Sequence, residues 1–159
     1  MNTIELEEGW AQIEIYVERL IQIVWSDDLK VPSHKFDNKD YMTVFTLVYS
    51  MGTQDHPHKY SEQLYSRYKK TYNDVFIQHV VPKIDVAPDT ELPDTIQEQW
   101  GNYKIFMKWM GSFFSYLDHF HTKRQGLPPV KGSDMGSRLF KDHLRNRLSE
   151  ESIDAILSK

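Results

Sequence analysis

Histidine is the residue of this chain most suited to chemistry, because imidazole binds metal ions and exchanges protons near neutral pH. The chain contains 7 histidines, and four of them form the His-x-His pairs His56–His58 and His119–His121. Such a pair can chelate zinc from a loop or a strand. On a helix, however, residues two apart point about 200° away from each other, so His119 and His121 could not share an ion there.

Other catalytic patterns are missing from the sequence. There is no cysteine, which excludes disulfides and thiolate-ligated zinc. No glycine-rich phosphate loop, nucleophile elbow or His-Glu-x-x-His motif occurs. Acids such as Asp118, beside His119, are more simply solvent-facing or capping groups than general bases. We therefore expect no metal, no cofactor and no catalytic residue, and a protein that is not an enzyme.

The elements that carry these residues are predicted to be helices, because apolar residues recur every three or four positions. No segment alternates like a strand, and the 159 residues suit one domain. The pattern predicts an all-α bundle of five or six helices within a single domain, 1–159. The expected helices cover residues 6–24, 40–54, 60–81, 96–123 and the segment after about 137. Pro82 is expected to end the third, and Gly101 or Gly111 to divide the fourth.

The segment 40–54 is more apolar than a surface helix requires. Such a helix needs an apolar stripe a little over 100° wide, and this one covers about twice that arc. It is either buried on most sides or presents an apolar face to a partner, and we favour the partner. The side chains that make up the arc are Tyr41, Met42, Val44, Phe45, Leu47, Val48, Tyr49 and Met51.

The segment 96–123 has the same surplus. One arc of this helix is expected to be core, and it includes Phe106, Met110, Phe113 and Leu117. An adjoining arc carries Ile105, Trp109, Ser112, Tyr116 and Phe120. The two apolar helices could pair and hide their surplus faces, or lie side by side and expose one large patch. Periodicity leaves both arrangements open.

Composition narrows the classes of partner. The net charge of -4 gives no reason to expect nucleic acid or an anionic membrane. The acidic N-terminus does not resemble a signal peptide, and no apolar run is long enough to span a bilayer. Aromatic residues make up 13% of the chain, which suits a large core or an interface. We expect a soluble intracellular protein.

Several motifs, taken together, resemble the N-terminal domain of a cullin. They are Asp-Tyr-Met-x-x-Phe-Thr-x-Val-Tyr-x-Met-x-Thr-Gln at 40–54, Pro-His-x-Tyr-Ser-x-Gln-Leu-Tyr-x-x-Tyr at 57–68, Trp-x-Asn-Tyr-Lys at 100–104, Trp-Met-x-x-Phe-Phe-x-Tyr-Leu-Asp at 109–118 and Leu-Pro-Pro-Val at 127–130. Their order and spacing are closest to cullins of the SCF type, which bind a Skp adaptor carrying an F-box protein.

This resemblance implies a first cullin repeat, in which two helices dock an adaptor of the BTB/POZ fold. It implies a non-catalytic scaffold of a ubiquitin ligase, located in the cytoplasm and nucleus. The partner-binding residues that it implies are Tyr41, Met42, Val44, Phe45, Val48 and Tyr49 on the early helix, and Trp109, Ser112, Tyr116 and His119 on the later one. The docking hypothesis requires that Tyr41, Phe45 and Tyr116 are not sealed inside the monomer.

The sequence also departs from the family pattern. Gly52 stands where relatives often carry Cys, and His119 where Arg is common. Only one repeat is expected here, in a fragment of a longer scaffold, so a RING-box subunit would bind only through a C-terminal domain that is absent. The alternatives are a BTB or elongin-type adaptor as the partner, and a truncated cullin-like decoy that sequesters adaptors.

Overall fold

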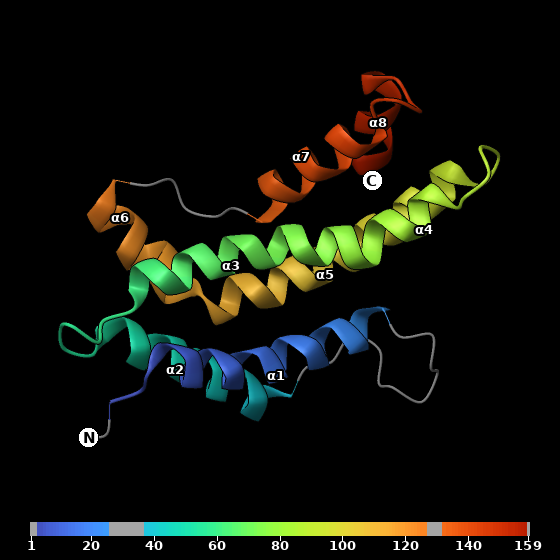
Figure 1. Cartoon of the computed structure of the whole chain (residues 1–159). Helices are drawn as coiled ribbons and strands as arrows, with labels where there is room; N and C mark the ends of the chain where they lie inside the picture. Colours follow the sequence, from blue (N-terminus) through green and yellow to red (C-terminus); the bar gives the residue numbers. More distant parts are fainter. Residues whose placement is uncertain (1–2, 26–36, 127–131, 159) are drawn as a thin grey trace.

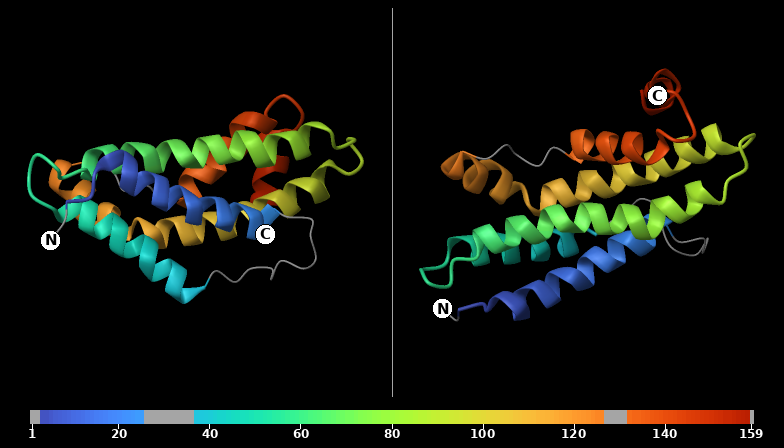
Figure 2. Two further views of the ribbon diagram at one scale, coloured as in Figure 1. Left: turned by 60° about the horizontal axis from the view of Figure 1, so that its bottom comes forward. Right: turned by 45° about the horizontal axis from the view of Figure 1, so that its top comes forward.

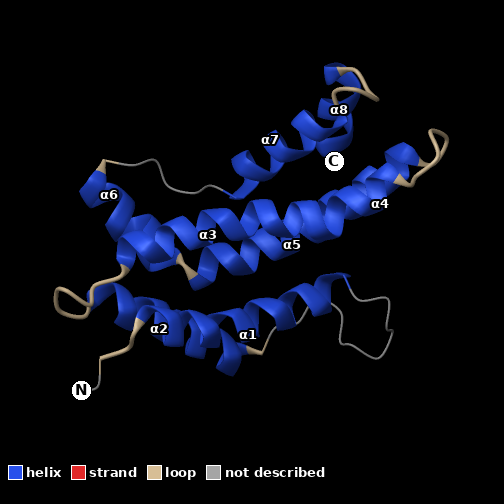
Figure 3. Cartoon of the chain, viewed as in Figure 1, coloured by secondary structure: helices blue, strands red, loops and turns tan. Residues whose placement is uncertain are grey.

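The computed structural model describes residues 3–25, 37–126 and 132–158. Regular structure in these ranges is helical and includes no strand (Figure 3), which confirms the all-α prediction. None of the described helices has the length and hydropathy needed to cross a membrane. In chain order the elements are α1 (Leu6–Trp25), α2 (Asn38–Thr53), α3 (Ser61–Val75), the π-helical turn η1 (Phe76–Val80), α4 (Val81–Asp85), α5 (Leu92–Phe113), the π-helical turn η2 (Leu117–His121), α6 (Thr122–Gln125), α7 (Gly132–Leu144) and α8 (Glu150–Leu157).

The helices form three layers. In the middle layer α3 and α5 lie side by side along the molecule (Figure 1). On one face α1 and α2 pack together, and both contact α5. On the opposite face α7 and α8 also contact α5 (Figure 2). Because α5 touches both outer layers, its position fixes the arrangement of the whole bundle.

Local interactions set the ends of α2. Asp37 is its N-cap, and the carboxylate accepts a hydrogen bond of 2.9 Å from the backbone N–H of Lys39. An ion pair between Arg19 and Asp40 joins the same end to α1. Beyond the other end, the Gln54 side chain bonds both the N–H and the carbonyl of Ile4, at 3.1 Å and 2.8 Å. These contacts hold α2 against α1 over its full length.

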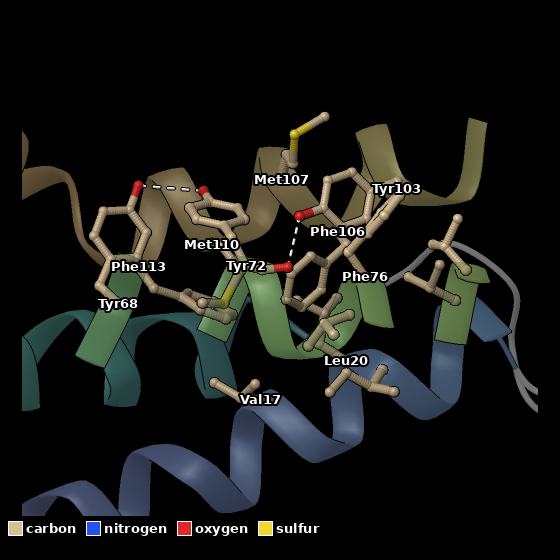
Figure 4. Packing of buried hydrophobic residues seen from close by; sticks show 14 of the residues in the cluster. Val17, Leu20, Tyr68, Tyr72, Phe76, Tyr103, Phe106, Met107, Met110 and Phe113 are labelled. Carbon is tan, nitrogen blue, oxygen red and sulfur yellow. Dashed lines mark hydrogen bonds between the residues drawn. The ribbon is translucent and has the colours of Figure 1, made fainter. Parts of the chain in front are cut away.

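Tyrosine side chains join α3 to α5 in the core (Figure 4). The Tyr103 hydroxyl donates to the Tyr72 carbonyl at 2.8 Å. The Tyr68 hydroxyl donates to an Asp118 carboxylate oxygen at 3.1 Å, and lies 3.2 Å from the Tyr72 hydroxyl. Since each hydroxyl carries one hydrogen, Tyr72 donates to Tyr68. The Tyr68 ring also stacks on Phe114, with 4.5 Å between ring centroids.

The predicted end of the third helix at Pro82 is wrong. The chain continues from α3 through η1 into α4, which ends at Asp85. In η1 the N–H of Val81 bonds the carbonyl of Phe76 across a π turn. Pro82 then lies in the first turn of α4, where the helix does not require its missing N–H.

The fourth predicted helix does divide, just beyond Gly111 and Ser112 and not at Gly101. Gly101 and Gly111 both lie inside α5, which ends at Phe113. The break follows at Phe114, whose ring is fully buried and packs between Tyr68 and Trp10. The end of α5 thus coincides with a ring that packs into the core.

The C-terminal segment forms two helices where the pattern predicted one. Ser149 caps α8, and its side chain accepts a bond from the N–H of Ser152. The segment 132–136, before the predicted start at about 137, is the first part of α7. There Gly136 packs closely on α5, because an added Cβ would lie 2.8 Å from the Met107 sulfur.

Alkaline pH is expected to destabilise the fold. Burial raises the pKa of Tyr68, Tyr72 and Tyr103, so the folded protein keeps these protons after the unfolded chain has released them. Their contribution is complete below about pH 10, the ordinary pKa of tyrosine, and declines above it by about 1.4 kcal/mol per pH unit for each residue. Urea unfolding from about pH 8 to 11, with tyrosinate absorbance, measures this. An unchanged free energy of unfolding would contradict it.

Tyr68→Phe is expected to lower the free energy of unfolding by about 1–3 kcal/mol, because it removes a hydrogen bond to a carboxylate and leaves the ring in place. Urea unfolding at neutral pH measures the change. The matched control is Tyr49→Phe, because Tyr49 is exposed, and this variant should stay within about 0.5 kcal/mol of the wild type. Equal effects in the two variants would show that the Asp118 bond is unimportant.

Candidate functional site

The predicted partner-binding residues come from α2 and from the chain that runs from the C-terminal part of α5 into η2. These elements lie against one another at one end of the molecule (Figure 1). Met42, Tyr49 and His119 are exposed, with Met42 at 52% and Tyr49 at 48%. The half-buried members are Tyr41, Phe45, Trp109, Ser112 and Tyr116. The rings of Tyr41, Phe45 and Tyr116 are therefore not sealed inside the monomer, as the docking hypothesis required.

Two of the ten predicted residues do not reach the surface. Val44 and Val48 are both 0% exposed and belong to the core. On a helix they lie one turn apart on the same face as Met51, which is also buried. We correct their role from contact residues to core residues that hold α2 in place beneath its exposed face.

At the N-terminal end of α2, Tyr41 joins the surface to the core. Its ring centroid lies 6.1 Å from Phe45 on the same helix and 6.1 Å from Trp109 on α5. It also lies 5.9 Å from Phe113, which is fully buried. Substitution of Tyr41 would therefore disturb the α2–α5 contact as well as the surface.

At the other end of α2, three rings form a row. Tyr49 meets Tyr116 edge to face at 5.2 Å, and Tyr116 stacks on Phe120 at 4.9 Å. Phe120 is 61% exposed. Sequence reasoning placed it on the same arc as Tyr116 but did not include it among the contact residues. We call Tyr41, Met42, Phe45, Tyr49, Trp109, Tyr116 and Phe120 together the aromatic surface.

Gly52 allows this row of rings to lie close to α2. A Cβ at this position would be 3.2 Å from a ring carbon of Tyr116. The missing side chain of Gly52 matters for this contact. It leaves room for the Tyr116 ring.

The turn η2 carries Phe120, and its orientation is fixed from the core side. Asp118 accepts the hydrogen bond from Tyr68 on α3, and its carbonyl accepts one from the Thr122 hydroxyl. Asp118 is thus neither a capping group nor a purely solvent-facing one, which corrects the sequence-based interpretation. Because α3 holds Asp118, the neighbouring side chains of η2 are held at the surface.

The structure shows where the histidines of the two His-x-His pairs lie. His119 is exposed while His121 is buried, so the two do not meet at one ion. Burial lowers the pKa of His121, the Glu62 carboxylate opposes that effect and Lys59 adds to it. In the other pair, His58 lies 3.5 Å from Glu5. Within residues 3–25, 37–126 and 132–158, no three His, Asp or Glu side chains are placed to hold a metal ion.

Two hollows border the aromatic surface. A groove of about 490 Å³ lies between α1 and α2, lined by Met42, Leu47 and Ile4 among others. A pocket of about 730 Å³ lies at the other end, with Tyr116 and Phe120 in its wall. Aromatic residues and methionine are enriched in protein interfaces. Hollows beside exposed rings can receive the side chains of another protein.

Comparison with known proteins identifies the family of this chain. The family described as the cullin alpha solenoid domain matches residues 10–159. Cullin-1 of Oryza sativa subsp. japonica is 30% identical over 157 residues, which are 99% of this chain and 20% of that protein. Cullin-2 of Arabidopsis thaliana is 33% identical over 153 residues, 96% of this chain and 20% of that protein.

A more distant relative is Cullin-like protein 3 of Arabidopsis thaliana, 22% identical over 155 residues, which are 98% of this chain and 57% of that protein. The chain thus spans about a fifth of the length of the first two relatives. No solved structure gives a significant match. Because the family match covers nearly the whole chain, this protein belongs to the cullin family.

Proposed function

We propose that this domain is a non-catalytic scaffold module of an SCF-type ubiquitin ligase, and that it docks a Skp adaptor carrying an F-box protein. The observation that carries the proposal is the row of exposed and half-buried rings that runs from Tyr49 on α2 through Tyr116 to Phe120 on η2. Single exposed apolar residues are normal on a monomer, but a contiguous group of them is typical of an interaction site. Two of the motifs that resemble SCF-type cullins, at 40–54 and 109–118, include Tyr49 and Tyr116 of this row.

The proposed mechanism is positional. Buried aromatic packing fixes α2 and α5 relative to each other, so a docked adaptor is held at a defined distance and angle. A scaffold that holds a substrate receptor in this way raises the effective concentration of substrate at a catalytic module elsewhere in the assembly. The domain then needs no reacting group of its own.

Tyr41 is a poor residue for testing this function, because its contact with Phe113 is structural. Met42 and Tyr49 are better, since about half of each side chain is free to meet a partner. They lie seven positions apart on the same face of α2, two helical turns from each other. Truncating both removes the centre of the aromatic surface while leaving the core unchanged.

The double substitution Met42→Ala, Tyr49→Ala is expected to weaken binding of a purified Skp adaptor at least about 30-fold. A hot-spot residue contributes about 2 kcal/mol or more, and about 1.4 kcal/mol is tenfold in affinity. Isothermal titration calorimetry measures the affinity, and circular dichroism checks that the fold is kept. The matched control is Ile15→Ala, Ile77→Ala, which truncates two exposed apolar side chains on α1 and η1.

The proposal fails in distinct ways. If the adaptor binds the Met42, Tyr49 variant as well as the wild type, the docking surface lies elsewhere. If the wild type binds a BTB or elongin-type adaptor in competition and no Skp adaptor, the SCF assignment is wrong but the scaffold role stands.

A further inference from the structure

The pocket of about 730 Å³ beside the aromatic surface has no role in the docking proposal. It lies between the segment after α2 and the chain from η2 to α6, and Tyr116 and His119 belong to both its wall and the predicted partner-binding residues. A partner seated on the aromatic surface would therefore reach the mouth of this pocket.

The pocket is basic although the chain as a whole is acidic. Lys59, Lys123 and Arg124 line it, with Glu62 as the one permanent anion in its wall. The net charge of the full chain is -4. Among the ion pairs of the described residues, none includes these three cations. The pocket thus holds positive charge that no ion pair of the described residues neutralises.

His121 provides a second, independent indication of a ligand. Its side chain lines the pocket, yet it is only 6% exposed, and its Nε2 has no hydrogen-bond partner within the described part of the chain. A buried polar atom without a partner is costly. A carboxylate in the pocket would lower this cost, because it attracts and can accept from an imidazole N–H.

The size and apolar wall of the pocket distinguish between classes of anion. Its volume exceeds what one phosphate or sulfate ion fills, and Phe120 presents an exposed ring beside the cations. A small ion would leave this ring in water. A peptide with carboxylates and an apolar side chain would match both features.

We propose that this pocket receives an acidic segment of the docked partner, with its carboxylates near Lys123 and Arg124 and an apolar side chain against Phe120. The inference rests on the proposed docking function and extends it, since it states the chemistry that the partner must present next to the aromatic surface. Complementary charges across an interface increase the association rate and fix the orientation of the complex.

The first test is the affinity of the Skp adaptor for the full chain carrying Lys123→Glu, Arg124→Glu. We expect a loss of about tenfold at low ionic strength that shrinks as sodium chloride is added, because salt screens exposed charges. The matched control is Lys83→Glu, Arg138→Glu, which reverses two exposed cations outside the pocket and gives the same net charge. Equal losses in both variants, or none in either, would overturn the inference while leaving the docking function intact.

The second test does not depend on the adaptor. A short glutamate-rich peptide with one central leucine is titrated into the wild type, and the His121 imidazole signals are followed by NMR. Saturable shifts that disappear in the Lys123, Arg124 variant support the inference even if no adaptor binds. An absence of saturable shifts overturns it. Equal shifts with inorganic phosphate also overturn it, because they would identify a general anion site.

Discussion

The hydrogen bond from Tyr68 to Asp118 is the constraint on which the arrangement of the surface depends. It links the middle of α3 to η2, and the same Tyr68 ring stacks on Phe114, where α5 ends. The end of one helix and the orientation of the next turn are thus determined by one buried side chain. Tyr116 and Phe120 lie within a few residues of these contacts, so core packing determines how the outer rings are presented.

Much of the fold follows from the sequence because apolar spacing is a local signal. The spacing predicts the first helix at 6–24 and the second at 40–54, and α1 and α2 agree with both within two residues. The breaks were harder, because they depend on contacts between distant segments. Pro82 fits inside a continuous helical segment that has a π turn before it, and α5 ends where the Phe114 ring enters the core. The position of Pro82 in the sequence, taken alone, predicts a helix end that the structure does not have.

The candidate surface was predicted only in part for a related reason. An arc of apolar residues on α2 shows that a surplus exists, but it cannot show which side of the arc faces the core. Val44 and Val48 lie on the buried side, and Met42 and Tyr49 on the exposed side. The basic pocket was not predicted at all, because Lys59 and Arg124 are far apart in the sequence and line the same pocket only after α5 folds back along α3.

The π-helical turn η2 has a consequence for how such domains diverge. Compared with an α-helix, a π turn accommodates one additional residue. A chain one residue shorter between Leu117 and His121 would continue as an ordinary α-helix, and every later side chain would rotate by about 100° about the axis. Phe120 would then leave the row that starts at Tyr49. Insertion or deletion of a single residue here would therefore change which side chains lie beside Tyr116, while the aromatic core beneath them stays the same.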